Sequence, residues 1–379
     1  MITEHTIFFA GGGSGGHIYP NMAVFERLCV GGYPVKGFFL VSSRELDARI
    51  TATHQLPFAT LPAAPFHIKP LALVRFLRCY MRSRALVERL IHQEQPRALV
   101  ATGGFVSAPA IAAACRCGIP VALVNLDAVP GKANRLMAGK TDEVFTLYQP
   151  DELPRAERID MPLRQSVLAT QKPSRARWEL GLRPDLETIL ITAGSQGAHS
   201  INKMMIELCS RSQIPKAFEN WQVIHLSGDK DQEAVHHAYQ HAGIRAVVQP
   251  FCDRMGLLWS AATLTISRAG AGTVAEAWMN AVPAIFMPYP FHKDQHQRFN
   301  AELLVNNGAA ILLNDLVDPV KNVNQLMGPL QALMANEARW GKMRQIMKQN
   351  PPGDGAMAIV NWILSVSGMG AGSMLKTDK

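Results

Sequence analysis

The sequence lacks any run of about 18 or more uncharged apolar residues, which is the length that a helix needs to cross a bilayer. Residues 1–5 carry no cluster of basic side chains ahead of the first apolar stretch, so we expect no secretory signal peptide. The six cysteines are scattered, and the spacing of Cys115 and Cys117 suits neither a zinc site nor a redox pair. These absences favour a cytoplasmic protein with reduced thiols.

Blocks of lysine and arginine interleaved with aromatic residues are also lacking. The chain is nevertheless basic, with a formal net charge of +8 over 379 residues, and such an excess favours an anionic partner. We expect no nucleic acid partner, because the basic and aromatic pattern typical of such proteins is missing. Acidic lipid and a phosphorylated substrate are the two classes that remain.

Short apolar runs alternate with longer amphipathic stretches, the pattern of repeated βαβ units around parallel sheets. The chain is long enough for two domains with separate cores. Strands of a first sheet are expected at residues 6–10, 35–41, 98–101 and 121–125. Strands of a second sheet are expected at residues 188–192, 222–226, 246–249, 263–266 and 284–287.

The two halves of the chain open in the same way. Residues 7–17 and 190–199 each combine an apolar strand, a glycine turn and a helix start. We therefore predict an α/β fold of two Rossmann-like domains facing a cleft, with ligands outside the carboxyl ends of the strands. The expected domains are 1–164 and 165–350, followed at 351–379 by a helix returning toward the first domain and a flexible tail. The glycine- and serine-rich residues 365–379 are expected to be disordered.

Residues 11–16 (GGGSGG) contain the pattern G-x-G-x-x-G directly after an expected strand. Glycines allow backbone N–H groups to approach a phosphate at a helix N-terminus. A dinucleotide site is disfavoured, because residues 42–44 (SSR) end the second strand where an acidic residue is usual. His17 follows the loop, and a histidine there can take a proton from an attacking hydroxyl. The alternative is a helix-start histidine that only bonds to the loop.

Three loops of the second half carry further polar groups. Residues 194–197 (GSQG) offer backbone donors and a serine hydroxyl, and residues 267–276 (SRAGAGTVAE) again join a strand to a helix. Thr273 can donate to phosphate, and Glu276 can accept both hydroxyls of a ribose, although the same pair fits a capping box equally well. Residues 288–301 gather amides and imidazoles that suit the hydroxyls of a sugar.

The motifs GGGSGGHIYP, ATGGFVSAP, AGSQGA and SRAGAGTVAE, followed by residues 294–301, occur in an order and spacing that resembles the MurG family. This GT-B family transfers N-acetylglucosamine from UDP-N-acetylglucosamine to undecaprenyl-pyrophosphoryl-muramyl-pentapeptide. The resemblance extends to about residue 315. It implies that His17 is catalytic and that the following residues bind substrate: Ser14, Gly15, Gly16, Asp127, Asn134, Arg164, Ser195, Cys252 (through its backbone), Arg268, Ala271, Gly272, Thr273, Val274, Ala275, Glu276, His296, Gln297 and Asn300.

One loop on the acceptor side departs from the family pattern. The family usually has His-Glu-Gln-Asn where residues 124–127 read VNLD, and it usually has Asn-Pro where Met161-Pro162 precede Arg164. Three alternatives therefore stay open. They are a UDP-sugar transferase with a different acceptor, a UDP-N-acetylglucosamine 2-epimerase, and a sugar-nucleotide sensor without catalysis.

The implied reaction is a single displacement with inversion at the anomeric carbon. The only Asp-x-Asp string, Asp229-Lys230-Asp231, lies at an expected helix start and is typical of a cap with an acidic first turn, so we expect no essential metal and no cofactor.

Residues 71–91 predict a basic amphipathic helix, with arginines at Arg75, Arg78, Arg82 and Arg89. Such a helix equally suits packing on a core with a solvated face. A lipid-linked substrate favours contact with an anionic membrane surface, which implies a peripheral protein at the cytoplasmic face of the cell membrane.

Overall fold

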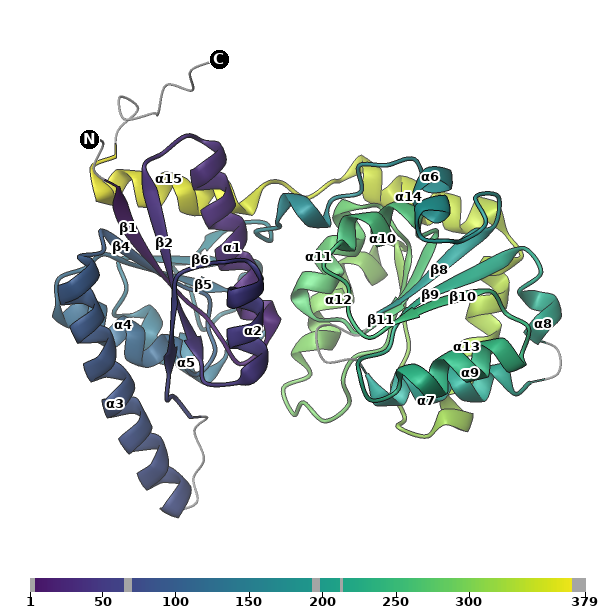
Figure 1. Ribbon diagram of the computed structural model, residues 1–379, viewed down its shortest axis with the longest axis horizontal. Coiled ribbons are helices and arrows are strands. Elements are labelled where there is room, and N and C mark those ends of the chain that lie inside the picture. The colour runs from purple at the N-terminus through teal and green to yellow at the C-terminus, as the bar shows by residue number, and fades with distance from the viewer. Residues whose placement is uncertain (1–3, 65–69, 193–197, 212–213, 370–379) are drawn as a thin grey trace. The chain divides into compact units, whose positions relative to one another are not determined.

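A computed structural model describes residues 4–64, 70–192, 198–211 and 214–369 of the chain. The chain divides into two compact units (Figure 1). The first unit is Met1–Arg164 with Gly353–Lys379, and the second is Gln165–Pro352.

The first unit is built on a seven-stranded parallel sheet of order β3-β2-β1-β4-β5-β6-β7. Its strands are β1 (His5–Ala10), β2 (Val35–Ser42), β3 (Phe58–Leu61), β4 (Ala98–Ala101), β5 (Val121–Asn125), β6 (Glu143–Thr146) and β7 (Glu157–Arg158). Its helices are α1 (Gly15–Val30), α2 (Glu45–Thr53), α3 (Pro70–Glu94), α4 (Ser107–Arg116), α5 (Lys132–Ala138) and α15 (Gly355–Ser367).

Both faces of this sheet are covered, which explains the continuous apolar runs of its central strands. Phe8 belongs to a core cluster with Val87 of α3 and Ile111 of α4. Its neighbour Phe9 points to the opposite face, where its ring stacks on Phe39 at 5.1 Å and meets the edge of Phe25 of α1 at 6.1 Å. Helices on both faces therefore leave only the sheet edge at the strand ends for a ligand.

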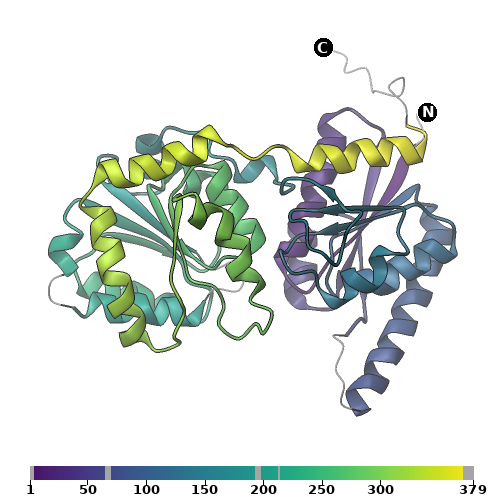
Figure 2. The same ribbon diagram turned by 180° about the vertical axis from the view of Figure 1, so that it is seen from behind.

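The last helix, α15, packs on α1 of the first unit (Figure 2). Three contacts fix the segment that leads into it. The Arg27 guanidinium lies 2.6 Å from Asp354, and the Gly353 N–H donates to Asp160 at 2.7 Å. A Cβ at Gly355 would lie only 1.7 Å from the Asp160 carbonyl oxygen, so this position admits only glycine.

The second unit repeats the arrangement with a six-stranded parallel sheet of order β10-β9-β8-β11-β12-β13. Its strands are β8 (Glu187–Thr192), β9 (Trp221–Leu226), β10 (Ala246–Gln249), β11 (Leu264–Ser267), β12 (Ala284–Phe286) and β13 (Ala310–Leu312). Its helices are η1 (Gln165–Val167), α6 (Pro173–Glu179), α7 (His199–Cys209), α8 (Ile214–Ala217), α9 (Gln232–His241), α10 (Met255–Ala261), α11 (Ala271–Met279), α12 (His296–Asn306), α13 (Pro319–Met334) and α14 (Glu337–Gln349).

The faces of the second sheet also alternate. Ile189 and Ile191 of β8 belong to a core cluster with Met204 of α7, whereas Leu190 belongs to another with Leu258 of α10. Counted within its own unit, each sheet has the strand order 3-2-1-4-5-6 of a doubly wound nucleotide-binding fold, and the first sheet adds β7 as a seventh strand beside β6. The prediction of two Rossmann-like α/β domains is confirmed.

Every strand expected from the sequence is present, with ends that differ by one residue at most. Four others, β3, β6, β7 and β13, were not predicted. β3, β6 and β7 are short, are at least partly exposed at some or all of their positions and lack a continuous apolar run, whereas β13 is apolar but only three residues long. The expectation of disorder from residue 365 is wrong for its first residues, because α15 continues to Ser367 and ends at Gly368 with φ +72°. Residues 370–379 lie outside the described part of the chain.

Candidate functional site

The turn between β1 and α1 lies at the carboxyl edge of the first sheet. A Cβ at Gly11 would come within 2.2 Å of the His17 carbonyl oxygen and 2.4 Å of Thr102 Oγ1, so the loop packs directly on the first turn of α1 and the end of β4. Ser14 is the N-cap of α1 in an extended conformation, and its side chain makes no capping hydrogen bond. Among the described residues no acceptor is bonded to the N–H groups of Gly15 and Gly16. These two groups are therefore available to an anion.

Gly13 is held from both sides by the connection between β2 and α2. Its N–H donates to Asp47 Oδ2 at 2.6 Å, and its carbonyl accepts from Arg44 Nη1 at 2.5 Å. The same Asp47 oxygen accepts from the Ser42 hydroxyl at 2.5 Å, and the Asp47 side chain is fully buried. Gly13 has φ +94°, which disfavours any other residue there. The N–H of Gly13 is thus bonded to Asp47. A phosphate would bind instead to the N–H groups of Gly15 and Gly16 at the start of α1.

His17 lies in the first turn of α1, half-buried, and its ring is oriented by the end of β4. Its Nδ1 is 2.9 Å from the Thr102 carbonyl oxygen. A carbonyl can only accept, so Nδ1 carries the ring proton and Nε2 is the nitrogen with a free electron pair. The hydroxyl of Thr102 also donates to the His17 carbonyl oxygen. The ring is therefore fixed in the tautomer that a general base requires.

Asn134, at the start of α5, lies beside His17. A Cβ built on Gly103 would contact Asn134 Oδ1 at 3.2 Å and His17 Cε1 at 3.3 Å, so both side chains border this one glycine. The Asn134 amide donates to Asn125 Oδ1 at 3.1 Å, and the Asn125 amide donates to the Asp127 carbonyl oxygen at 2.8 Å. The structure thus connects His17, Asn134 and the loop after β5 in one polar cluster.

Tyr148 follows β6, bonds through its backbone to the Thr146 hydroxyl, and is half-buried. Burial, followed by the negative charge of Asp127, raises the pKa of its phenol far above the usual value. The phenol therefore stays protonated, and Asp127 is the residue of the loop after β5 whose charge acts on it.

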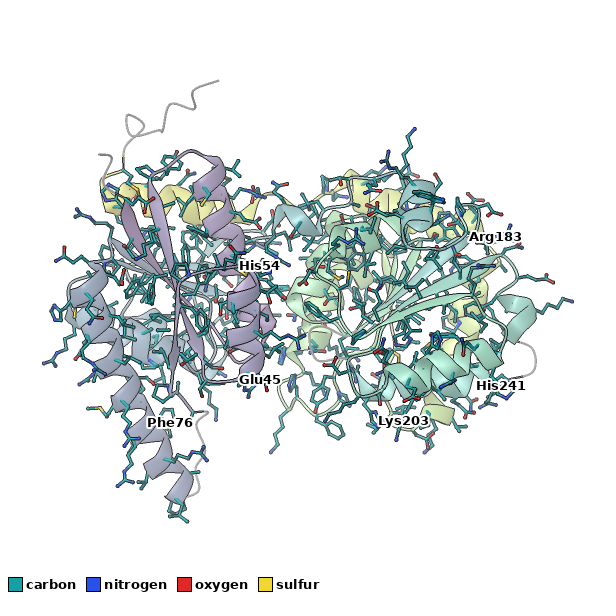
Figure 3. All side chains as sticks on the ribbon, in the orientation of Figure 1. Glu45, His54, Phe76, Arg183, Lys203 and His241 are labelled. Atoms are coloured by element: carbon teal, nitrogen blue, oxygen red, sulfur yellow. The ribbon has the colours of Figure 1, made fainter. Side chains whose placement is uncertain are left out.

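Arg164, the last residue of the first unit, packs within that unit. It is 6% exposed, and its guanidinium lies 4.2 Å from the centre of the Tyr19 ring in α1. Its Nη1 lies 3.3 Å from Nε2 of His54, which caps the end of α2 (Figure 3). Arginine can only donate, so His54 Nε2 accepts this bond. Arg164 is thus positioned by two helices of the first unit.

In the second unit, Arg268 follows β11 and is almost fully buried. Its Nη1 donates to the Met287 and Pro288 carbonyl oxygens at 2.9 and 3.1 Å, and its Nη2 lies 2.7 Å from both Ser200 Oγ and Asp315 Oδ2. The sequence predicts Arg268 as a substrate contact. In the structure its guanidinium joins the loops after β11, β12 and β13 through Nη1 and Nη2, and the substrate contact stays a prediction.

The carboxylate of Asp315 completes this junction. Burial raises the pKa of Asp315, but hydrogen bonds from Ser200 and Asn322, together with the charge of Arg268, bring that pKa below its usual value. The ion pair therefore persists at neutral pH.

The helix α11 begins one turn earlier than the capping-box prediction requires. Its N-cap is Gly270, so Thr273 lies inside the first turn and the alternative of a capping box between Thr273 and Glu276 is wrong. Glu276 Oε2 instead accepts from the indole N–H of Trp259 at 2.7 Å. The first turn consists of Ala271, Gly272, Thr273, Val274 and Ala275, and the side chains of the last two are buried. Only backbone groups of these two residues can meet a ligand.

The loop after β12 leads into α12 with three of the predicted sugar contacts. Gln297 Oε1 accepts from the Tyr289 N–H at 2.9 Å, and His296 Nδ1 lies 2.8 Å from Asp294 Oδ1. Asn300 is 1% exposed and donates to the Ala269 carbonyl oxygen at 3.3 Å, so it ties α12 to the loop before α11. The structure therefore brings the residues of the two loops together.

The other predicted positions of this unit are less informative. Cys252 follows β10, packs partly into the core, and burial raises the pKa of its thiol. Ser195 lies outside the described residues. Asp231 is the N-cap of α9 as expected, but its side chain makes no capping bond and accepts instead from His199 Nδ1 and Asn202 Nδ2, at 2.9 and 2.8 Å. Neither aspartate of the Asp-x-Asp string forms the expected cap bond.

Several residues that shape the first site were not predicted as site residues from the sequence. Asp47 and Arg44 hold Gly13, Thr102 orients His17, and Asn125 links Asn134 to the following loop. Asp47 could have been found, because an acidic residue is expected near the end of the second strand of such folds, and Asp47 lies a few residues past that end. It lies in the first turn of α2 and reaches back to the strand end.

Two doubly wound units with polar side chains gathered at the carboxyl ends of their strands are the architecture of a GT-B glycosyltransferase. Residues 7–146 match the glycosyltransferase family 28 N-terminal domain, and residues 188–351 match the glycosyltransferase family 28 C-terminal domain.

Among relatives, the chain is 32% identical over 362 residues to a protein of Leifsonia xyli subsp. xyli, across 94% of this chain and 98% of that one. That protein is named UDP-N-acetylglucosamine–N-acetylmuramyl-(pentapeptide) pyrophosphoryl-undecaprenol N-acetylglucosamine transferase. The crystal structure of Acinetobacter baumannii MurG superposes with a TM-score of 0.70 at 25% identity, covering 96% of this chain and 100% of that one. The chain belongs to the MurG family of glycosyltransferases. A UDP-N-acetylglucosamine 2-epimerase structure, with a TM-score of 0.62 at 15% identity over 97% of this chain and 98% of that one, shares the fold alone.

Proposed function

We propose that the chain transfers N-acetylglucosamine from UDP-N-acetylglucosamine to undecaprenyl-pyrophosphoryl-muramyl-pentapeptide, with inversion at the anomeric carbon. The observation that carries this proposal is His17, whose Nδ1 is bound to the Thr102 carbonyl so that Nε2 can accept a proton. A sugar hydroxyl is a poor nucleophile at neutral pH and needs such a base. The family relationship supports the identity of both substrates.

The first unit supplies the groups for the acceptor. The unused N–H groups of Gly15 and Gly16 lie at the N-terminus of a 16-residue helix, where the helix dipole attracts the acceptor pyrophosphate. His17 lies one position further along the same turn. Binding the pyrophosphate there places the muramyl hydroxyl toward His17, with Asn134 and Asp127 beside it.

The second unit supplies the groups for the donor. The backbone of the first turn of α11 suits the diphosphate, and the carboxylate of Glu276 suits the ribose. Gln297, His296 and Asn300 offer amide and imidazole groups to the sugar, and the backbone of Cys252 is assigned to the uracil. Ser195 and Arg164 complete the donor contacts. Backbone donors and arginine stabilise the charge that develops on the departing diphosphate. This reaction uses no essential metal and no cofactor.

The helix α3 supports a role at a membrane. Its later residues Val87 and Ile91 are buried in the core of the first unit, but its earlier apolar side chains are not, and Leu71 is 88% exposed. Figure 1 shows these first turns projecting beyond the rest of the first unit. Among the described residues no helix is both long and apolar enough to cross a bilayer. We therefore assign α3 to peripheral contact with an anionic membrane at its cytoplasmic face, with no role in nucleic acid binding.

The arginines of α3 lie on its exposed part beside these apolar side chains. Arg75, Arg78 and Arg82 each add about 1 kcal/mol of attraction near an anionic surface. An amphipathic helix with such a polar face binds in the plane of the membrane. The exposed apolar residues are Leu71, Val74, Leu77 and Met81.

The direct test follows UDP release from UDP-N-acetylglucosamine with and without the lipid-linked muramyl acceptor. We expect release only with the acceptor. Conversion of the donor without any acceptor would indicate an epimerase, and release with another acceptor but not this one would indicate a related transferase. The altered loop ending at Asp127 makes the last comparison necessary.

A further inference from the structure

The turn between β12 and α12 brings three metal-ligating side chains together within five consecutive residues. His292, Asp294 and His296 each offer one ligand atom, and these atoms all lie within 4.8 Å of one another. Between Asp294 and His296, Gln295 has φ +49°, a left-handed conformation that non-glycine residues adopt at a cost of about 1 kcal/mol or more. This residue turns the chain so that side chains on either side of it meet.

The three side chains are close but not tightly locked. The rings of His292 and His296 are stacked, with centroids 4.4 Å apart and planes at 29°, and Asp294 Oδ1 lies 2.8 Å from His296 Nδ1. Asp294 is exposed, whereas His292 and His296, the latter at the start of α12, are half-buried. An ion from solvent can therefore enter from the side of Asp294, and rotation of this exposed side chain with small adjustments of the two rings would close the site.

We propose that His292, Asp294 and His296 bind one divalent transition-metal ion of the Zn²⁺ type. Two imidazoles and one carboxylate are the ligands that Zn²⁺, Co²⁺ and Ni²⁺ prefer, whereas Mg²⁺ and Ca²⁺ prefer oxygen ligands alone. Zinc bonds to nitrogen and oxygen are about 2.0–2.2 Å long, so the ligand atoms must approach to roughly 3–3.5 Å of one another. Three protein ligands leave a position for water, as in exchangeable rather than structural sites.

A bound ion would change the binding of the sugar donor, and this consequence rests on the proposed function. His296 is one of the predicted sugar contacts, and it cannot orient its ring toward both a metal and the sugar. We therefore expect Zn²⁺ and UDP-N-acetylglucosamine to weaken each other's binding by the same factor, as linkage requires.

The test titrates Zn²⁺ into the untagged full-length chain, stripped with a chelator, in competition with a chromophoric chelator. We expect one tight site per chain in the parent. His292→Ala and Asp294→Asn should each weaken it by at least about tenfold, because each removes a ligand. His237→Ala is the matched control, because His237 is exposed beside Glu233 at 3.8 Å and should leave zinc binding unchanged.

The proposed site would be overturned if the parent chain bound less than one Zn²⁺ per chain tightly. It would also be overturned if the parent and both ligand variants bound Zn²⁺ with equal affinity. A second titration with saturating UDP-N-acetylglucosamine tests the coupling, and an unchanged zinc affinity would overturn it. A chain that binds no UDP-N-acetylglucosamine would refute the proposed function instead, while the titration without donor would still decide the metal site.

Discussion

Replacing Asp47 by Asn tests how the glycine loop positions His17. In the parent, one carboxylate oxygen accepts from both the Gly13 N–H and the Ser42 hydroxyl, at 2.6 and 2.5 Å. The second oxygen is buried with no hydrogen-bond partner among the described residues. An asparagine can place its amide oxygen on the two donors, but its NH₂ group must then take the position where nothing accepts.

The size of the effect follows from these contacts. Two charge-assisted hydrogen bonds become neutral ones of roughly half the strength. A buried NH₂ without an acceptor costs about 1–3 kcal/mol, partly offset because a buried charge is removed. We expect Asp47→Asn to lower the free energy of unfolding by about 1–3 kcal/mol. Turnover should fall by up to about a hundredfold, because a displaced loop misplaces His17.

The assay combines urea unfolding with steady-state kinetics and calorimetry of UDP binding. UDP affinity should change much less than turnover, since all the assigned donor groups except Arg164 belong to the other unit. Asp47→Glu serves as a control that keeps the charge but changes the reach. Unchanged stability and turnover in Asp47→Asn would refute the reasoning, and so would a fall in UDP affinity as large as the fall in turnover.

Three other predictions test separate parts of the account. Glu276→Ala should weaken UDP binding and remove a hydrogen bond from a buried indole, whereas a loss of stability with unchanged calorimetric UDP affinity would make Glu276 purely structural. Replacing Arg75, Arg78 and Arg82 together by Gln should reduce binding to anionic vesicles and its salt dependence, and equal vesicle binding would leave α3 without a membrane role. Burial lowers the pKa of His225 to about 3 in the folded chain. As the pH falls, His225 is therefore protonated in the unfolded chain before it is protonated in the folded chain. Stability should therefore drop by up to about 1.4 kcal/mol per pH unit from pH 6 toward pH 3, and an unchanged slope of urea-derived stability in His225→Gln would contradict this origin.

Strands buried on both faces could be predicted from the sequence, because helices cover both sides and every position must be apolar. β4 and β5 show this, with every residue buried. The two edge strands of the first sheet could not, since both residues of β7 are exposed and β3 is only partly covered. The missing signal is physical, because an edge strand is held by backbone hydrogen bonds that depend little on side-chain type.

Features of the candidate site that involve residues adjacent in the sequence could be predicted. Features that depend on contacts between distant segments could not. His17 and the glycine loop adjoin in the chain, so their proximity could be predicted. The clamp of Asp47 on Gly13 joins residues 34 positions apart, and Arg268 reaches carbonyl oxygens 19 and 20 positions away. The cap at Thr273 was misplaced because Gly270 satisfies the same extended backbone without a side chain.

The measurement that tests the central claim most directly is turnover of His17→Ala at saturating acceptor, across pH 6–9. If His17 Nε2 is the base, turnover should fall by about 10²–10⁴-fold, UDP-N-acetylglucosamine affinity should be nearly unchanged, and the acidic limb of the parent's pH profile should vanish. A mutant that keeps the limb and loses less than several-fold in turnover would show that His17 is not the base, and Asp127 would be the next residue to test.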